Sequence, residues 1–211
     1  QTVNPRTNVK AMNVLYLACP SSCMVWYGAE QVPRRNQASR HSARVHRLHS
    51  IEEYWLASEG MYRSSGVKSK VNKLKAAYNN SQSVNLYGTE PSVVASLLKL
   101  FLRELPDPVL THKLLPSFEE VSAMKQTQKR VEGVKSVLGK LPDCNRVLVQ
   151  WIFVHMAHVI QKEKYNKMTL QNVSIVLSPT MQISHRVLNC FFENSHALFA
   201  GQWVQIGDFL N

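Results

Sequence analysis

The amino-acid sequence predicts an all-α fold, and three observations support this prediction. Several separate segments carry apolar residues at the three- and four-residue spacing of amphipathic helices. No run of alternating apolar and polar residues is long enough to require a β-sheet. The chain has 211 residues, 45% of them hydrophobic and 18% charged, which suits one well-buried core. We therefore expect a helical bundle that forms a single domain.

The first two helices are expected between residues 67 and 105. From 67 to 78 the apolar positions share one helical face, and Asn79-Asn80-Ser81 supplies a stop. Pro91 suits the first position of the next helix, because its ring fixes φ and no hydrogen-bond donor is needed there. Pro106 and Pro108 are expected to end it, since the residue before a proline disfavours helical geometry.

Later segments predict further helices. Helical periods occur at 131–141, 147–160 and 187–199, with a shorter one at 170–177. Asp143 is the candidate cap of the helix at 147–160, and Thr169 precedes the short helix. Ser178-Pro179 is expected to close that short helix.

The N-terminal segment differs from the rest of the chain. Residues 1–50 show no sustained period and carry seven basic residues against Glu30, a net charge of +6. Pro20 interrupts the apolar run 12–27, so we interpret this run as neither a signal peptide nor a membrane span. We expect 1–50 to be an atypical, basic, mobile extension and 51–211 to be the domain.

The formal net charge of +11 suits nucleic acid, an anionic membrane or an acidic protein, and its sign does not choose among them. Aromatic residues are not interleaved with the N-terminal arginines, so we expect no nucleic acid partner. The same basic segment leaves peripheral contact with anionic membranes open.

The cysteines and histidines do not indicate a metal site. Cys19 and Cys23, with three histidines between residues 41 and 49, miss the spacing of zinc fingers. His155 and His158 lie three residues apart without an acidic ligand, so we expect a partly exposed pair. Four scattered cysteines favour a reducing compartment, and therefore a cytoplasmic location, with the membrane surface as a second one.

Several motifs of catalysis are missing. The sequence has no glycine-rich phosphate loop, no His-Glu-x-x-His and no Gly-x-Ser-x-Gly. We therefore do not expect an enzyme with its own nucleotide or nucleophile.

One arginine lies between two glycines just before a helix, in Glu59-Gly60-Met61-Tyr62-Arg63-Ser64-Ser65-Gly66. The glycines permit a tight exposed loop, from which the guanidinium can reach outward with its fork of donors. Such a fork is what a transferring phosphoryl group needs in trans. Taken alone, the pattern is more often a merely solvated arginine.

A second basic feature follows on the next helix. Lys99 and Arg103 lie four residues apart, on one helical face, where two like charges repel. An anionic partner would explain the pair, and a solvated basic face is the simpler alternative.

Three segments together resemble the RhoGAP family of GTPase-activating domains. Residues 59–66 resemble its arginine-finger motif, and Leu97-Leu98-Lys99-Leu100-Phe101-Leu102-Arg103-Glu104-Leu105-Pro106-Asp107-Pro108 resembles its signature helix. Gln171-Asn172-Val173-Ser174-Ile175-Val176-Leu177-Ser178-Pro179-Thr180 resembles its third block. The resemblance covers about 51–199, and the stretches 74–78, 151–160 and 177–192 are most similar to one subgroup.

The resemblance implies a role for each of five residues. Arg63 would be the catalytic finger. Lys99 and Arg103 would brace the finger loop and contact the switch region of a GTPase. Asn172 would contact the switch surface, and Pro179 would shape the same face.

The resemblance also implies a partner, a Rho-family small GTPase of the Rac/Cdc subgroup in the GTP-bound state. Mg²⁺ and GTP would be bound by that partner, so the chain would need no cofactor of its own. The alternative is a catalytically weak or inactive RhoGAP-like interaction module, although loss of the finger is the usual mark of such modules and Arg63 is present.

The chain departs from the family pattern at its start. Only Ile51-Glu52-Glu53-Tyr54 resembles the end of the family's N-terminal helix, and Trp55 stands where a small residue is usual. Residues 1–50 match no part of the family pattern.

Overall fold

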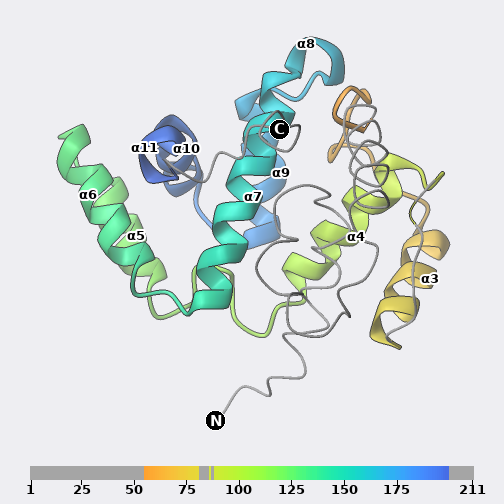
Figure 1. The fold of residues 1–211 in the computed structure, drawn as a ribbon, viewed down its shortest axis with the longest axis horizontal. Helices are drawn as coiled ribbons and strands as arrows, with labels where there is room; N and C mark the ends of the chain where they lie inside the picture. Colours follow the sequence, from red (N-terminus) through yellow and green to blue (C-terminus); the bar gives the residue numbers. More distant parts are fainter. Residues whose placement is uncertain (1–54, 81–85, 87, 200–211) are drawn as a thin grey trace, which may run out of the picture. The chain divides into compact units, whose positions relative to one another are not determined.

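The computed structural model describes residues 55–80, 86 and 88–199 (Figure 1). The described residues form helices, turns and loops without a β-strand, which confirms the all-α prediction. The chain divides into two compact units after Leu98, and each is considered by itself. Among the described residues, no helix is long and apolar enough to cross a membrane.

The first unit contains α3 (Lys68–Asn79) and the first turns of α4 (Pro91–Arg103). Both helices begin and end close to their predicted positions, with Pro91 as the first residue of α4. Val71 and Tyr78 form the buried side of α3. The buried residues of this part of α4 are Val93, Val94, Ala95, Leu97 and Leu98.

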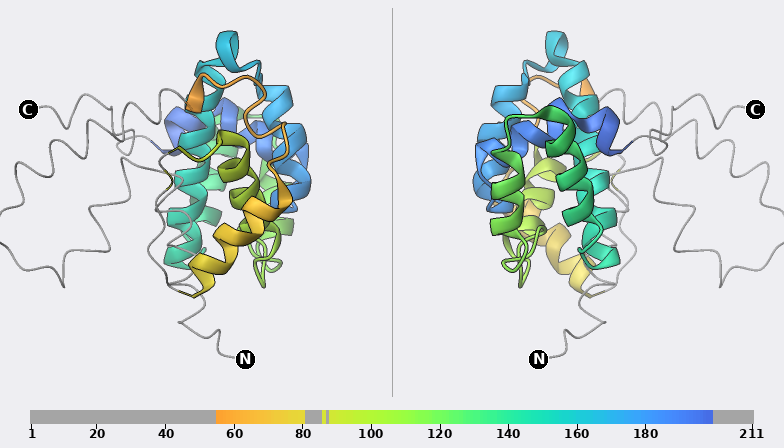
Figure 2. Two further views of the ribbon diagram at one scale, coloured as in Figure 1. Left: turned by 90° about the vertical axis from the view of Figure 1, so that its right-hand side faces the viewer. Right: turned by 90° about the vertical axis from the view of Figure 1, so that its left-hand side faces the viewer.

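The second unit holds the end of α4 and seven further helices within the described residues. They are α5 (Leu115–Ser122), α6 (Thr127–Leu138), α7 (Asp143–Gln161), α8 (Glu163–Asn166), α9 (Leu170–Met181), α10 (His185–Glu193) and α11 (Ser195–Leu198). Helix α10 contacts α5, α7, α9 and α11, and α5 also packs on α6 (Figures 1 and 2). Helices α5 and α8 were not expected from the sequence.

Phenylalanine rings fill the centre of the second unit. Phe153 of α7 lies with its ring centroid 4.6 Å from that of Phe191, 5.0 Å from that of Phe192 and 6.2 Å from that of Phe199. Phe118 of α5 joins the group at 5.8 Å from Phe191. All five side chains are buried, so α5, α7 and α10 share one aromatic core.

Several helix boundaries differ from the prediction. Asp143 is not a cap: Pro142 occupies the N-cap position, and Asp143 is the first residue of α7, where its carboxylate pairs with Arg146. A carboxylate in the first turn complements the helix dipole without capping. The helix predicted at 187–199 is two helices, because the Asn194 side chain donates to the Cys190 carbonyl at 2.7 Å where α10 ends.

Helix α9 does not stop at Ser178-Pro179 but continues through Pro179 to Met181. A proline in a helix removes one backbone hydrogen bond, and here only two residues follow it. The Thr180 hydroxyl donates to the Val176 carbonyl at 2.7 Å, which satisfies a neighbouring carbonyl of the same turn. The helix ends at Gln182, which adopts the left-handed conformation with φ of 57°.

The predictions for residues 1–50, including the mobile extension and the absence of a zinc site there, lie outside the described residues.

Candidate functional site

The Arg63 loop, residues 59–66, starts from a buried anchor. Trp55 and Leu56, just before it, are buried, and the Ser58 N–H donates to the Trp55 carbonyl at 3.0 Å. The Met61 N–H donates to the Ser58 carbonyl at 3.2 Å, so consecutive turns lead into the loop. Met61 is itself buried.

Two residues of the loop then adopt a positive φ angle. Gly60 has φ of 69°, which glycine adopts at no steric penalty, and Tyr62 has φ of 68°, which is unfavourable for a bulky residue. The Gly60 carbonyl accepts hydrogen bonds from the N–H groups of Arg63 at 2.9 Å and Ser64 at 2.8 Å. Tyr62 is only 3% exposed, and this burial holds the strained conformation in place.

Arg63 follows Tyr62 and is exposed. Its guanidinium lies back over Gly60, where an added Cβ would come within 3.7 Å of Nη2 and 3.8 Å of Nε. The same Cβ would lie 2.9 Å from Ser64 Oγ. Gly60 therefore stabilises the loop in two ways: it adopts the positive φ that the turn requires, and its lack of a side chain leaves space for Arg63 and Ser64.

The C-terminal end of the loop rests on α4 through contacts that we call the Gly66 seat: Gly66 against Ser92, Val93 and Ser96. The Gly66 N–H donates to Ser96 Oγ at 2.8 Å. A Cβ added to Gly66 would lie 2.5 Å from Val93 Cα and 2.7 Å from the Ser92 carbonyl oxygen, closer than real Cβ atoms approach. Only glycine fits this position without a shift of the loop or the helix.

An ion pair lies just beyond the Gly66 seat. Lys70 Nζ, in the first turn of α3, is 2.6 Å from Glu90 Oε1, which precedes α4. Both side chains are more than half exposed, so the pair contributes little to stability.

The expected basic pair lies on the last turns of α4. Arg103 is exposed, while Lys99 is half-buried. Burial lowers the pKa of Lys99, and the positive charge of Arg103 lowers it further. The two side chains therefore share one face of the helix, as the spacing predicted.

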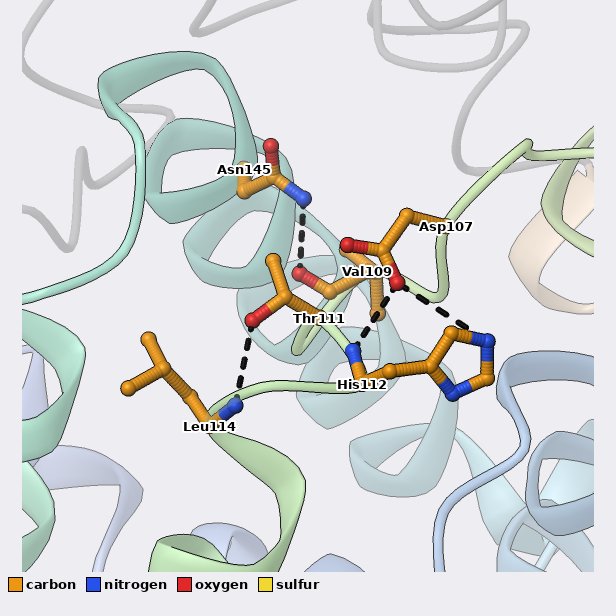
Figure 3. Close-up of polar contacts among 6 residues, drawn as sticks. All are labelled: Asp107, Val109, Thr111, His112, Leu114 and Asn145. Carbon is orange, nitrogen blue, oxygen red and sulfur yellow. Dashed lines mark hydrogen bonds and ion pairs between the residues drawn. The ribbon is translucent and has the colours of Figure 1, made fainter. Parts of the chain in front are cut away.

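The turn after α4 is held by side chains (Figure 3). The Asp107 carboxylate accepts a hydrogen bond from the His112 N–H at 2.8 Å, and Asn145 of α7 donates to the Val109 carbonyl at 3.0 Å. Thr111, with φ of 58°, accepts at its hydroxyl from the Leu114 N–H at 3.3 Å. These contacts fix the Pro-Asp-Pro end of the signature segment within the second unit.

Asn172 lies in the first turn of α9, where it supports the preceding turn. Its side-chain amide donates to the Lys167 carbonyl at 2.9 Å, and its backbone N–H donates to the hydroxyl of the N-cap residue Thr169 at 3.3 Å. Lys167 is left-handed, with φ of 60°. Asn172 therefore positions the connection between α8 and α9.

Pro179 is exposed on α9 and shares a helical stripe with Asn172, because the two are seven residues apart. Ile175 lies between them on the same stripe and is 54% exposed. The three residues form what we call the α9 face, a half-buried amide next to two exposed apolar side chains. Single exposed apolar side chains are ordinary on protein surfaces, so the α9 face by itself does not identify an interface.

The histidine pair of α7 differs from the prediction. His158 is half-buried, but His155 is only 4% exposed and its ring stacks on Trp151, with centroids 5.2 Å apart. Burial, with a smaller effect of His158, lowers the pKa of His155 to about 3, and burial lowers that of His158 as well. In the described part of the chain, no group of three or more His, Cys, Asp or Glu residues could hold a metal ion.

The five residues singled out from the sequence occupy both units. Arg63 belongs to the first unit. The second unit contains Lys99 and Arg103, together on α4, and Asn172 and Pro179, together on α9. Sequence reasoning missed Ser96 and Ile175. Ile175 could have been noticed as an apolar residue on the polar side of α9, whereas nothing in the sequence paired Ser96 with a residue 30 positions away.

Comparisons with known proteins identify the family of the chain. Residues 45–186 match the RhoGAP domain family. RalA-binding protein 1-A of Xenopus laevis is 52% identical over 156 residues, which are 74% of this chain and 24% of that protein. RalA-binding protein 1 of Drosophila melanogaster is 37% identical over 69% of this chain and 23% of its own length. The chain thus spans about a quarter of the length of these relatives. The stretches 74–78, 151–160 and 177–192 indicated the subgroup of the Ral-binding protein, and the two relatives confirm that subgroup.

Solved structures are similar as well. The BH domain of Graf, described as the GTPase regulator associated with focal adhesion kinase, superposes with a TM-score of 0.65 at 27% identity, covering 72% of this chain and 89% of that one. Human Rho GTPase activating protein 15 gives a TM-score of 0.68 at 27% identity, covering 72% of this chain and 80% of that one.

Proposed function

Because this chain belongs to the RhoGAP family, we propose that it is a GTPase-activating domain for Rho-family small GTPases, and that it supplies Arg63 in trans to a GTP-bound partner. The observation that carries this proposal is the exposure of Arg63 between two anchored positions, the buried Tyr62 and the Gly66 seat. A solvated surface arginine needs neither a strained residue before it nor a close backbone contact after it.

The proposed chemistry takes place in the nucleotide site of the partner. There the partner holds Mg²⁺ and GTP, and negative charge develops on the oxygens around the transferring phosphoryl group. A guanidinium keeps its positive charge and offers planar paired donors that match those oxygens. An arginine supplied in this way accelerates GTP hydrolysis by roughly 10³–10⁵.

Arg63 could reach a partner with little movement of the loop. Its guanidinium lies over Gly60 in the unbound chain and can swing outward by rotation about side-chain bonds. The backbone on either side is held, at Tyr62 by burial and at Gly66 by α4. The backbone of an arginine presented in this way loses little conformational freedom when the side chain enters the partner's site.

Two further surfaces are proposed to bind the GTPase. Lys99 and Arg103 offer positive charge at the end of α4, and their mutual repulsion would be relieved by an acidic partner surface. The α9 face offers apolar contacts through Ile175 and Pro179, with Asn172 fixing the turn before them. These surfaces are expected to contribute affinity, whereas Arg63 contributes to rate.

We also propose a preference for the Rac/Cdc subgroup, which the family resemblance of the sequence implies. The formal charge of +11 supports peripheral contact with anionic membranes. Sedimentation with vesicles containing anionic lipid, at low and at physiological salt, tests the membrane contact. Equal recovery with neutral vesicles would contradict it.

GTP hydrolysis by a panel of Rho-family GTPases, with and without the chain, tests the proposed function. We expect stimulation of at least one member, strongest in the Rac/Cdc subgroup. Lys99→Ala and Arg103→Ala should each raise the Kd for the GTP-loaded partner by about tenfold, the loss of roughly one charge-assisted contact. A chain that folds and binds a GTPase but stimulates none would instead be an interaction module.

A further inference from the structure

We propose that Ser96 is a positioning residue for Arg63: its hydroxyl holds Gly66 and so fixes the C-terminal end of the Arg63 loop. The inference rests on the proposed function of Arg63 and extends it to a residue outside the loop. Ser96 lies in the second turn of α4, 30 residues along the chain from Gly66.

The contact between Ser96 and Gly66 is specific. The Gly66 N–H donates to Ser96 Oγ at 2.8 Å in a partly buried setting. Ser92 and Val93 lie four and three residues before Ser96, hence on the same side of α4, and their backbone atoms meet the open Cα of Gly66. One face of α4 therefore supplies both a hydrogen-bond acceptor and a close-packed surface to a single glycine.

The chemistry of Ser96 is unusual for its position. A serine hydroxyl within a helix commonly bonds back to a carbonyl of its own helix or to water. Here the flanking residues Ala95 and Leu97 are buried, and the hydroxyl oxygen accepts from a separate segment. Alanine at position 96 would favour the helix more, so the serine is better explained by its contact with the loop.

The contact matters because of the short span that it closes. Only Arg63, Ser64 and Ser65 lie between the buried Tyr62 and Gly66, and all three are exposed. With both ends held, the Cα of Arg63 is confined to a small region. Release of the Gly66 end would let Arg63 sample positions from which its guanidinium misses the transition state.

The test combines three variants with two readouts. Ser96→Ala removes the acceptor, Ser96→Thr keeps Oγ, and Ser69→Ala is a control at an exposed serine of α3. Hydrogen exchange of the Gly66 amide reports the hydrogen bond directly, without any GTPase. Single-turnover stimulated hydrolysis and the Kd for a GTP-loaded GTPase report its consequence.

We expect Ser96→Ala to speed exchange at Gly66 and to lower the stimulated rate by about 2- to 12-fold, the range for one neutral hydrogen bond, with little change in Kd. Ser96→Thr and Ser69→Ala should behave like the unchanged chain. In an Arg63→Ala background, Ser96→Ala should cause no further loss, because there is no guanidinium left to position.

Each contrary outcome identifies what is wrong. If Arg63→Ala abolishes stimulation while Ser96→Ala keeps the full rate, the positioning role of Ser96 is overturned and the proposed function stands. If the effect of Ser96→Ala persists in the Arg63→Ala background, Ser96 acts through folding or docking and not through Arg63. If Arg63→Ala itself changes nothing, the proposed function fails and the role of Ser96 fails with it, even where exchange at Gly66 confirms the hydrogen bond.

Discussion

The Arg63 loop and the aromatic core of the second unit are built in opposite ways. The loop is held by a few backbone hydrogen bonds, two left-handed residues and one glycine seat, and it leaves its central side chain exposed. The core brings five phenylalanine rings together from α5, α7, α10 and the residues just after α11, and leaves none exposed. From this difference we expect stability and the proposed activity to depend on separate residues.

The magnitudes support this separation. One backbone hydrogen bond contributes about 1 kcal/mol to the free energy of unfolding. Truncation of a buried phenylalanine to alanine lowers that free energy by roughly 3–5 kcal/mol. Substitutions in the loop should therefore change the proposed activity more than the free energy of unfolding. Substitutions in the core should do the reverse.

Phe153→Ala should have the largest effect on stability. Its ring is fully buried and stacks on Phe191, so truncation should lower the free energy of unfolding by about 3–5 kcal/mol. Chemical denaturation measures the change, and Tyr165→Ala, at a side chain 66% exposed, is the aromatic control expected within about 0.5 kcal/mol of the unchanged chain. A loss below about 1 kcal/mol for Phe153→Ala would show that the core is not centred there.

Gly66→Ala tests the contact between the Arg63 loop and α4. The new Cβ would meet Val93 Cα at 2.5 Å, and relieving this overlap should cost about 1–3 kcal/mol and move the end of the Arg63 loop. We expect the stimulated rate per folded molecule to fall at least about tenfold. Gly139→Ala is the matched control, because Gly139 has φ of −63° and a Cβ added there would lie an ordinary 3.5 Å from the Ser136 carbonyl oxygen. Equal activity of the two variants would contradict the importance of the seat.

The smallest effect concerns pH and the stacked His155. The pKa of His155 is lowered from 6.5 to about 3 in the folded chain. Between about pH 3 and pH 6.5 the unfolded chain therefore binds more protons at this residue than the folded chain does. The stability contributed by neutral His155 is therefore present above pH 6.5 and is lost as the pH falls below it. Acidification from pH 7.5 to 5.5 should therefore lower the free energy of unfolding by roughly 1 kcal/mol through this residue.

Denaturation of the unchanged chain and of His155→Gln at both pH values measures that contribution. The variant should show a smaller loss on acidification by about the same amount. An identical pH dependence in the two proteins would mean that His155 is protonated as readily in the folded chain as in the unfolded chain.

The sequence predicted the helical class and most helix positions, because amphipathic spacing and the proline at position 91 act locally. It failed at other positions, for more than one physical reason. Pro179 was expected to end a helix, but α9 needs only two more residues and continues through it. His155 was expected to be partly exposed, but packing on Trp151 buries it.

The site was accessible from the sequence only in part. Lys99 and Arg103 share a helix face, as their spacing required, and Arg63 is exposed in its glycine-flanked loop. The strain at Tyr62 and the fit of Gly66 against Val93 arise from backbone conformation and from segments distant in the chain. Such features need coordinates, because no periodicity or composition encodes them.

The most direct test of the central claim measures rate and affinity together for Arg63→Ala. With a Rho-family GTPase that the unchanged chain stimulates, the variant should lose roughly 10³–10⁵ of the stimulated rate while its Kd for the GTP-loaded partner changes little. Arg63→Lys should restore little of the rate, because a point charge does not reproduce the planar fork of donors. An Arg63→Ala variant that stimulates hydrolysis as well as the unchanged chain would contradict the assignment of Arg63.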